Sequence, residues 1–259
     1  DETLLVSNEP IKNRAQILSE NIIKWGHEGS FVSCNFPKDF KKLGALFDVV
    51  VVDAPCSGEG MFRKDNPALD MWSVTNVKEC ALRQREIVET IWPTLKEGGY
   101  LIYSTCTYNT LEDEENVEYF CKELNAEPVD IPVSPSLNIT GNLLKGSTIP
   151  VYRFMPHKTR GEGFFLAMIR KKAPTSSVKL KGKTTFKPIS KEWAKMLTNS
   201  DFAIFEKDET GFAVRQNDVP LVNHLLTTLY PLHTGISLFE KKGPKTIPSH
   251  GLAMSRLLN

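Results

Sequence analysis

The sequence has no apolar run that approaches the roughly 20 residues needed to cross a membrane. Its longest run, residues 47–52, contains Asp48 and has the length of a strand. The chain begins with Asp1 and Glu2 rather than with basic residues, and the apolar segment of a secretory signal does not follow. We therefore predict a protein with no membrane partner.

The chain also has few cysteines and no Cys-x-x-Cys pair. The five cysteines are an odd number, and they are widely spaced at positions Cys34, Cys56, Cys80, Cys106 and Cys121. This pattern argues against a disulfide framework and against a zinc site, so we predict no metal. Free thiols fit a reducing compartment, and we predict a cytoplasmic location.

Bulk composition is typical of a globular protein. Of the 259 residues, 41% are hydrophobic and 24% are charged, which suits one large domain or two modest ones. The net charge of +1 conceals one basic stretch, residues 170–191, with eight basic residues and no acidic one. Such a stretch suits either a polyanion-binding segment or a solvated linker, and both readings stay open.

Short β-rich runs alternate with helical periodicity over the first 170 residues. We predict strands at 4–7, 30–34, 47–52, 100–104 and 164–170, and helices at 11–25, 77–95 and 111–124. This alternation predicts an α/β fold with a parallel or mostly parallel sheet and helices on both faces. Ligands bind such sheets at the carboxyl ends of the strands, where this sequence has Glu9, Asn35, Asp53 and Cys106.

Composition changes after Arg170 and divides the chain. We predict a domain at 1–170, a basic linker at 171–190 rich in Lys, Thr, Ser and Pro, and a small α+β module at 191–259. The helix at 111–124 opens with Glu112, Asp113, Glu114 and Glu115. We interpret this acidic run as a complement to the helix dipole rather than as a site.

Two cysteines follow predicted strands. Asp53-Ala54-Pro55-Cys56 ends one strand, and Ser104-Thr105-Cys106-Thr107 ends another. Either cysteine alone is readily explained as a small buried apolar residue. Adjacent strands lie about 5 Å apart, however, so both thiols could face one site. A thiolate there could serve as a nucleophile. Arg63 and Lys64, just beyond Cys56, could supply positive charge or simply lie in an exposed loop.

The run from Asp53 to Asp65, with Tyr103-Ser104-Thr105-Cys106-Thr107, resembles the Sun/Fmu-type (NOL/NOP/Sun) family of S-adenosylmethionine-dependent RNA cytosine-5 methyltransferases. The resemblance is strongest to the bacterial 16S ribosomal RNA branch. It covers residues 4–170 and continues more weakly to Asn259. It implies a Rossmann-like class I methyltransferase sheet, followed by a small RNA-binding α+β module at 191–259.

The resemblance also implies roles for individual residues. Cys106 would add to C6 of cytosine so that C5 can accept the methyl group, and Cys56 would assist product release. Glu9 would bind the ribose hydroxyls of S-adenosylmethionine. Asn35 would lie near the adenine, where the family usually has Asp, and an amide can still accept a hydrogen bond there. Asp53 would lie near the methionine end of the cofactor and the target base.

One departure from the family pattern concerns the cofactor loop. The family has a glycine-rich loop with a lysine after the first strand of its sheet, and residues 1–259 contain no such loop. We therefore predict that the sequence is truncated at both ends, lacking the first strand and helix of the sheet. The isolated chain is expected to bind S-adenosylmethionine poorly and to be inactive.

The predicted partner is ribosomal RNA of the small subunit, bound by a monomer through the basic stretch and the 191–259 module. Three alternatives stay open. The acceptor could be tRNA rather than ribosomal RNA. The acceptor atom could be an exocyclic amine, which needs no thiol. The chain could also be a catalytically incomplete RNA-binding paralogue or fragment.

Overall fold

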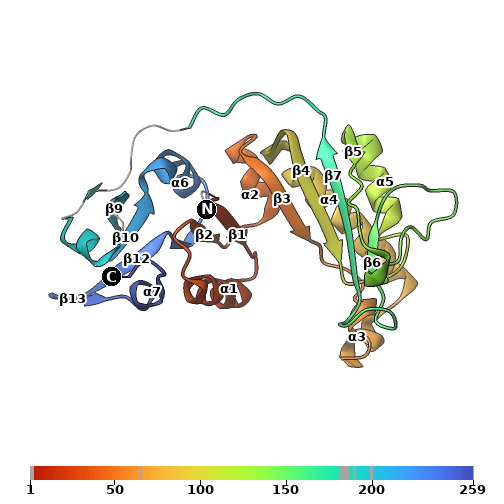
Figure 1. Cartoon of the computed structure of the whole chain (residues 1–259), viewed down its shortest axis with the longest axis horizontal. Helices are drawn as coiled ribbons and strands as arrows, with labels where there is room; N and C mark the ends of the chain where they lie inside the picture. Colours follow the sequence, from red (N-terminus) through yellow and green to blue (C-terminus); the bar gives the residue numbers. More distant parts are fainter. Residues whose placement is uncertain (1–2, 65, 181–186, 189–190, 199–200, 259) are drawn as a thin grey trace. The chain divides into compact units, whose positions relative to one another are not determined.

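The computed structural model describes residues 3–64, 66–180, 187–188, 191–198 and 201–258. It contains two compact units (Figure 1). Gly44–Val178 form the first, here called the thiol unit because it holds Cys56 and Cys106. Asp1–Leu43 together with Lys179–Asn259 form the second, the terminal unit. The predicted domain boundaries at 170 and 190 stay a prediction, and residues 181–186 and 189–190 of the predicted linker lie outside the described residues.

The sheet of the thiol unit has the strand order β3-β4-β7-β5, with β6 also paired to β7. These strands are β3 (Phe47–Asp53), β4 (Leu95–Thr105), β5 (Ala126–Pro128), β6 (Tyr152–Phe154) and β7 (Phe164–Lys171). β3 and β4 are parallel, whereas β7 is antiparallel to β4. β3 and β4 therefore end at the same edge of the sheet, and each is followed by one of the two thiols.

Helices cover one face of this sheet. The unit contains α3 (Asn66–Met71), α4 (Val74–Ile91) and α5 (Glu114–Glu123). α4 and α5 contribute apolar side chains to a core with alternate residues of the strands. Its fully buried members include Val88, Leu101, Tyr103, Val117, Phe120 and Phe165.

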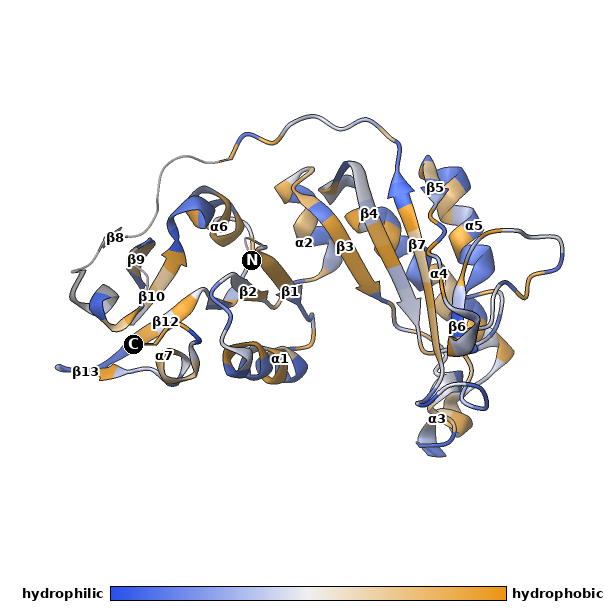
Figure 2. Cartoon of the chain, viewed as in Figure 1, coloured by the Kyte–Doolittle hydropathy of each residue, from blue (hydrophilic) through white to orange (hydrophobic). Residues whose placement is uncertain are grey.

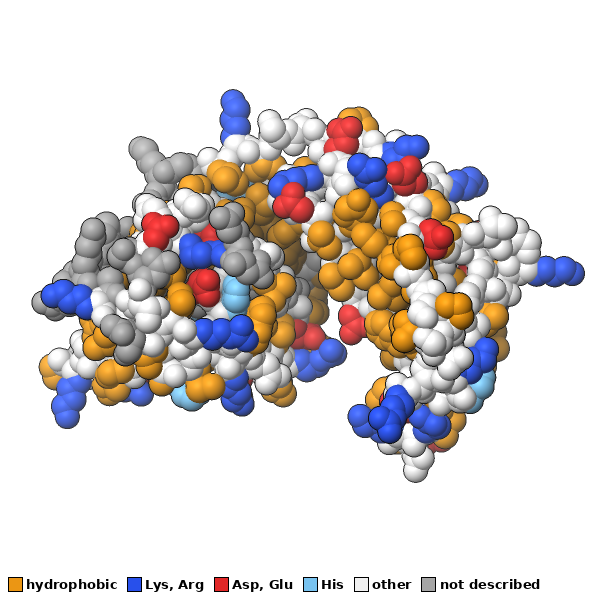
Figure 3. Space-filling view, in the orientation of Figure 1, with side chains coloured by type: hydrophobic (Ala, Val, Ile, Leu, Met, Phe, Trp, Pro, Cys, Tyr) orange, Lys and Arg blue, Asp and Glu red, His pale blue; other side chains and the backbone are white. Residues whose placement is uncertain are grey.

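The opposite face of β3 is exposed. Val51 retains 65% and Val49 retains 49% of its accessible surface, while Val52, on the core side, is buried. Apolar residues colour β3 in Figure 2, and hydrophobic side chains gather on the surface over this sheet in Figure 3. Within the thiol unit, no described helix covers Val49 and Val51 on this face.

The terminal unit has a small sheet with the order β1-β2-β11. Its strands are β1 (Leu5–Asn8), β2 (Ser30–Ser33) and β11 (Pro231–Thr234). β1 and β2 are parallel, and β11 adds to β2 in the antiparallel direction. Residues from the two ends of the sequence thus share one sheet.

Helix α1 (Lys12–Trp25) connects β1 to β2 and ends at Gly26, which has a φ of 70°. Glycine adopts this left-handed conformation without a steric penalty, so the predicted C-cap is confirmed. A short helix, α2 (Pro37–Phe40), follows β2.

A second sheet of the terminal unit has the order β13-β12-β10-β9-β8, with antiparallel neighbours throughout. It comprises β8 (Lys187–Pro188), β9 (Phe202–Lys207), β10 (Thr210–Arg215), β12 (Ile236–Lys242) and β13 (Lys245–Pro248). The terminal unit also contains the helices α6 (Val219–Leu226) and α7 (His250–Met254). The mixture of strands and helices predicted after residue 191 is confirmed.

Among the differences from the predicted elements, two concern where α4 and β4 begin. α4 begins earlier than residue 77, because the Ser73 side chain accepts a hydrogen bond from the backbone N–H of Asn76 and caps it. β4 begins at Leu95 rather than at Tyr100, so Gly98 lies inside the strand. The β3–β4 register shifts between the pairs Phe47–Leu95 and Val49–Tyr100, and Gly98, which has a positive φ, lies between those two partners on β4.

We expected β1, β2, β3 and β4 to form one sheet. In the described residues they belong to two sheets, with β1 and β2 in one and β3 and β4 in the other. No described helix is long and apolar enough to span a membrane.

Candidate active site

The two thiols meet where β3 and β4 end. Asp53 pairs with Ser104 at the last position of the parallel ladder, and the backbone N–H of Ala54 donates to the Ser104 carbonyl at 2.9 Å. Cys56 and Cys106 follow directly. Their sulfur atoms lie 2.9 Å apart, and both side chains are half-buried. The proximity expected from neighbouring parallel strands is confirmed.

This contact makes the two thiols chemically unequal. A hydrogen bond from the Cys56 S–H lowers the pKa of Cys106 below its ordinary value, although burial and the nearby Asp53 carboxylate oppose that effect. The same hydrogen bond and burial raise the pKa of Cys56. Of the two thiols, Cys106 therefore gives up its proton more readily.

The segments after the two thiols are joined by direct bonds. We call residues 54–60 the Cys56 loop and residues 106–110 the Cys106 loop. Gly60 N–H donates to the carbonyl of Cys106 at 2.7 Å. The Glu59 carboxylate accepts from the N–H of Tyr108 at 2.8 Å and from the Asn109 side chain at 3.2 Å. These bonds hold the loops, and thus the thiols, against each other.

Most of the acidic run at the start of α5 is buried, and the expectation that all four of its residues lie in the first turn of the helix was wrong. Glu112, Asp113 and Glu114 are fully buried. Only Glu114 and Glu115 lie in the first turn of α5. Burying carboxylates is costly unless each is paired or hydrogen-bonded, and each of these three has such partners.

Asp113 and Glu114 share one fully buried cation, Arg153. Its guanidinium lies 3.0 Å from Asp113 and 2.7 Å from Glu114, and it packs on the Phe165 ring. Asp113 also accepts a 2.7 Å hydrogen bond from the Thr105 hydroxyl. Burial raises the pKa of Asp113, while the Thr105 bond and Arg153 act against that rise. Through Thr105, this buried ion pair anchors the residue before Cys106.

Glu112 and the fully buried Gln84 were also missed from the sequence. Gln84 lies on α4, four residues after Cys80 and four before Val88, on the side of the helix that faces the core. A polar residue at a core-facing position of an amphipathic helix was the available signal. Arg153 gave a similar signal, since it lies between two aromatic residues in a strand.

Asp53 lies beside the thiols with an exposed side chain, and the Ser104 hydroxyl donates to it at 3.4 Å. Arg63 has no described hydrogen bond to Cys56. It donates to the Gly161 carbonyl at 3.0 Å and lies 3.5 Å from Glu162. Arg63 therefore ties the Cys56 side of the unit to the 161–163 segment.

Glu9 and Asn35 belong to the terminal unit, where they follow the adjacent parallel strands β1 and β2. Glu9 accepts from the N–H of Ile11 at 2.9 Å and pairs with Arg14 at 3.0 Å. Each carboxylate oxygen has a second lone pair, so it can still accept from a hydroxyl. This arrangement is compatible with the predicted ribose contact, which stays a prediction.

Asn35 bonds to three segments. Its backbone N–H donates to the side chain of Asn8 at 3.0 Å, and its side chain donates to Asp39 at 3.2 Å. Its amide oxygen accepts from the N–H of Tyr230 at 2.8 Å. An aspartate at this position would face the Asp39 carboxylate without a proton to donate, so the amide suits this chain.

The site defines a class of α/β proteins in which two thiols lie at the carboxyl ends of neighbouring parallel strands. Residues 1–170 match the family described as 16S rRNA methyltransferase RsmB/F. The chain is 32% identical over 263 residues to the ribosomal RNA small subunit methyltransferase F of Vibrio campbellii, covering 96% of this chain. It is 34% identical over 260 residues to the protein of that name from Vibrio vulnificus, covering 93% of this chain.

The chain therefore belongs to the RsmB/F methyltransferase family. It spans about half the length of these curated relatives, 52% and 53% respectively.

Two solved structures from Pyrococcus horikoshii share the fold. NSun6 with SFG is 28% identical, with a TM-score of 0.55 over 65% of this chain and 41% of that chain. A methyltransferase homologue is 23% identical, with a TM-score of 0.53 over 65% of this chain and 53% of that chain. They support the predicted Rossmann-like α/β class.

Proposed function

We propose that this chain carries the thiol centre of an S-adenosylmethionine-dependent methyltransferase that modifies C5 of a cytosine in small-subunit ribosomal RNA. The observation that carries the proposal is the Cys56–Cys106 pair, with sulfur atoms 2.9 Å apart and the lowered pKa on Cys106. Family membership supports methylation, and the curated relatives are named for small-subunit ribosomal RNA.

The chemistry explains why a thiolate is needed. C5 of cytosine is a weak nucleophile. The Cys106 thiolate adds to C6, the C5–C6 double bond opens, and its electron pair makes C5 nucleophilic. S-adenosylmethionine, when bound, would supply the electrophilic methyl group to C5 and leave as S-adenosylhomocysteine. Loss of the C5 proton to a base then restores the double bond and expels Cys106.

Cys56 fits the release step. Its S–H donates toward the Cys106 sulfur, so it stabilises the thiolate both before attack and when the adduct breaks down. In our proposal, Cys56 thereby lowers the barrier to expulsion of Cys106.

The cofactor residues are proposed on weaker grounds. Glu9 and Asn35 follow neighbouring parallel strands in the terminal unit, a suitable place for the nucleoside end of S-adenosylmethionine. Asp53 follows β3 in the thiol unit, where it would face the methionine end. The solved NSun6 relative is in complex with SFG, an S-adenosylmethionine analogue, which supports this choice of cofactor.

The test uses a polypeptide of the relatives' full length. Cys106→Ser is expected to abolish transfer of a labelled methyl group to 16S ribosomal RNA. Cys56→Ala should form an RNA–protein adduct that survives a denaturing gel, because release is slowed. Cys121→Ser is the control and should retain activity, because Cys121 lies in the second half of α5 and has no described bond to either thiol. RNA methylation by Cys106→Ser would exclude the covalent mechanism and favour an exocyclic amine as acceptor.

For the 259-residue chain by itself, we propose weak cofactor binding, since residues 1–259 do not contain the family's glycine-rich cofactor loop with its lysine. Calorimetric titration with S-adenosylmethionine measures this directly. Micromolar binding would contradict the proposal. A monomeric state and a cytoplasmic location stay predictions.

A further inference from the structure

One buried carboxylate, Glu112, binds the Cys56 loop from beneath. Its Oε2 accepts from the backbone N–H of Ser57 at 3.0 Å and from the Gln84 amide at 2.7 Å. Its Oε1 accepts from the Asn109 amide at 2.8 Å. Glu112 is fully buried, so these three N–H donors replace its hydration.

Gln84, which donates to Glu112, also binds the residue before Cys56. Its amide also donates to the carbonyl of Pro55 at 2.9 Å. Its own oxygen accepts from the Tyr103 hydroxyl at 2.9 Å and from Asn116 at 2.8 Å, which fixes the direction in which the amide points. The peptide groups before and after Cys56 are thus both bound by one buried network.

We propose that Glu112 is the positioning residue of Cys56, holding its backbone so that the S–H is directed at the Cys106 sulfur. The inference rests on the proposed function, in which Cys56 serves Cys106. Glu112 itself touches neither sulfur in the described contacts. It acts through Ser57 on one side and through Gln84 and Pro55 on the other.

The chemistry of the network requires a carboxylate at this position. Three N–H groups point at Glu112, and an ionised carboxylate only accepts. In Glu112→Gln, the new NH₂ group must face either Ser57 and Gln84 or Asn109, all of which are donors. Flipping Asn109 would not repair this, because its oxygen already accepts from the backbone N–H of Glu112 at 2.9 Å.

The experiment measures the pH dependence of Cys106 alkylation by iodoacetamide in this chain, with labelled peptides read by mass spectrometry. Cys56→Ala removes the donor and should raise the alkylation midpoint of Cys106 by about one pH unit. Glu112→Gln should produce a shift in the same direction, because a displaced Cys56 no longer donates. Glu118→Gln, the same change at a half-buried residue of α5, should keep the wild-type profile.

Folding is checked by thermal unfolding, and Asn109→Ala provides a second variant at a less buried position. It removes one of the three donors and should give a smaller upward shift. If Glu112→Gln folds and keeps the wild-type profile while Cys56→Ala shifts it, the positioning role is wrong. If Glu112→Gln does not fold, an unshifted Asn109→Ala overturns the inference. If Cys56→Ala also leaves the profile unchanged, Cys56 does not lower the pKa of Cys106, and both the inference and the thiol pair of the proposed function are wrong.

Discussion

Gly60 shows how little space separates the two thiol-bearing loops. A Cβ at this position would lie 2.7 Å from the carbonyl oxygen of Cys106 and 2.8 Å from that of Gly163. Both are backbone atoms, so neither can move without displacing its loop. The close approach also permits the bond from Gly60 N–H to the Cys106 carbonyl. Glycine is required here by contact rather than by backbone conformation.

Gly60→Ala is therefore expected to destabilise the chain by about 1–3 kcal/mol, the usual cost of overpacking. Urea-induced unfolding measures the change. Gly141→Ala is the matched control, since its Cβ would meet nothing within 4 Å. Equal stability of the two variants would show that the loops can separate freely.

The cysteines themselves offer a second test at this scale. Burial raises the pKa of Cys121 to about 11, whereas the bond from Cys56 lowers that of Cys106. Because the thiolate is the reactive form, iodoacetamide at pH 7.5 should alkylate Cys106 at least about 100-fold faster than Cys121. Peptide mapping over time gives both rates from one sample. Comparable rates would contradict the assignment of Cys106 as the thiolate.

At the scale of elements, β4 organises the thiol unit. It pairs with β3 on one side and with β7 on the other, and it delivers Cys106 at its carboxyl end. Its alternate residues Leu101 and Tyr103 lie in the core under α4 and α5. Stability of this one strand therefore governs both the sheet and the position of the thiol.

Leu101→Ala tests this dependence. The side chain is 1% exposed, so its truncation should cost about 2–5 kcal/mol. Leu82→Ala makes the same chemical change on α4 at a residue that is 64% exposed, and should change stability by about 0.5 kcal/mol or less. Chemical denaturation of both variants is the measurement. Similar losses would mean that β4 does not carry the core.

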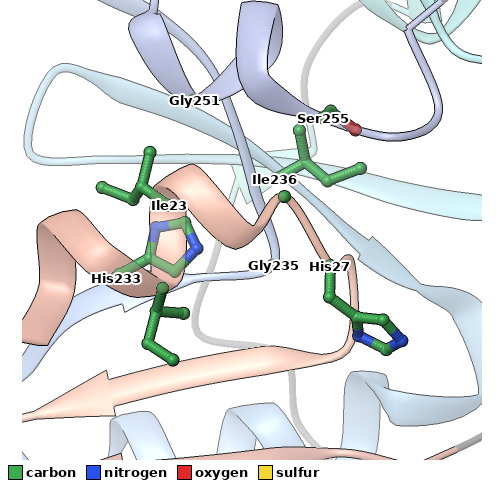
Figure 4. A pocket seen from close by; sticks show the side chains of 9 residues that line it. Ile23, His27, His233, Gly235, Ile236, Gly251 and Ser255 are labelled. Carbon is green, nitrogen blue, oxygen red and sulfur yellow. The ribbon is translucent and has the colours of Figure 1, made fainter.

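At the scale of the whole molecule, the terminal unit joins distant parts of the sequence through β11. His233 on this strand is buried beside a cavity of about 10 Å³ that Ile23, Gly235 and Ile236 also line (Figure 4). Its Nδ1 has no hydrogen-bond partner among the described protein atoms. Burial lowers the pKa of His233 to about 4.

This pKa predicts acid sensitivity. The unfolded chain binds the His233 proton below about pH 6.5, whereas the folded chain resists it until about pH 4. The contribution of neutral His233 to the free energy of unfolding is thus fully present above pH 6.5. It decreases as the pH falls, by about 2 kcal/mol between pH 7 and pH 5. In His233→Leu, the free energy of unfolding measured with urea should fall by about 2 kcal/mol less between pH 7 and pH 5 than in the wild type. If the variant loses as much stability between pH 7 and pH 5 as the wild type, His233 does not cause the acid sensitivity.

Local patterns were sufficient to predict much of this protein. Apolar periodicity identified α1 with its Gly26 cap, the continuous run identified β3, and the two thiol motifs followed strands that proved to be neighbours. These features depend on residues close in sequence. Element ends were less accurate, as at α4, because capping by Ser73 and pairing of β4 depend on specific contacts.

The sequence by itself determined the α/β class, the Cys56 and Cys106 motifs and the family to which they point. Only the tertiary structure decided that Glu112, Asp113 and Glu114 are buried, because an acidic run at a helix start has the same composition whether it faces water or the core. The partners that make their burial possible come from distant segments, among them Gln84 and Arg153. Burial of charge depends on such long-range pairing, which local sequence patterns do not encode.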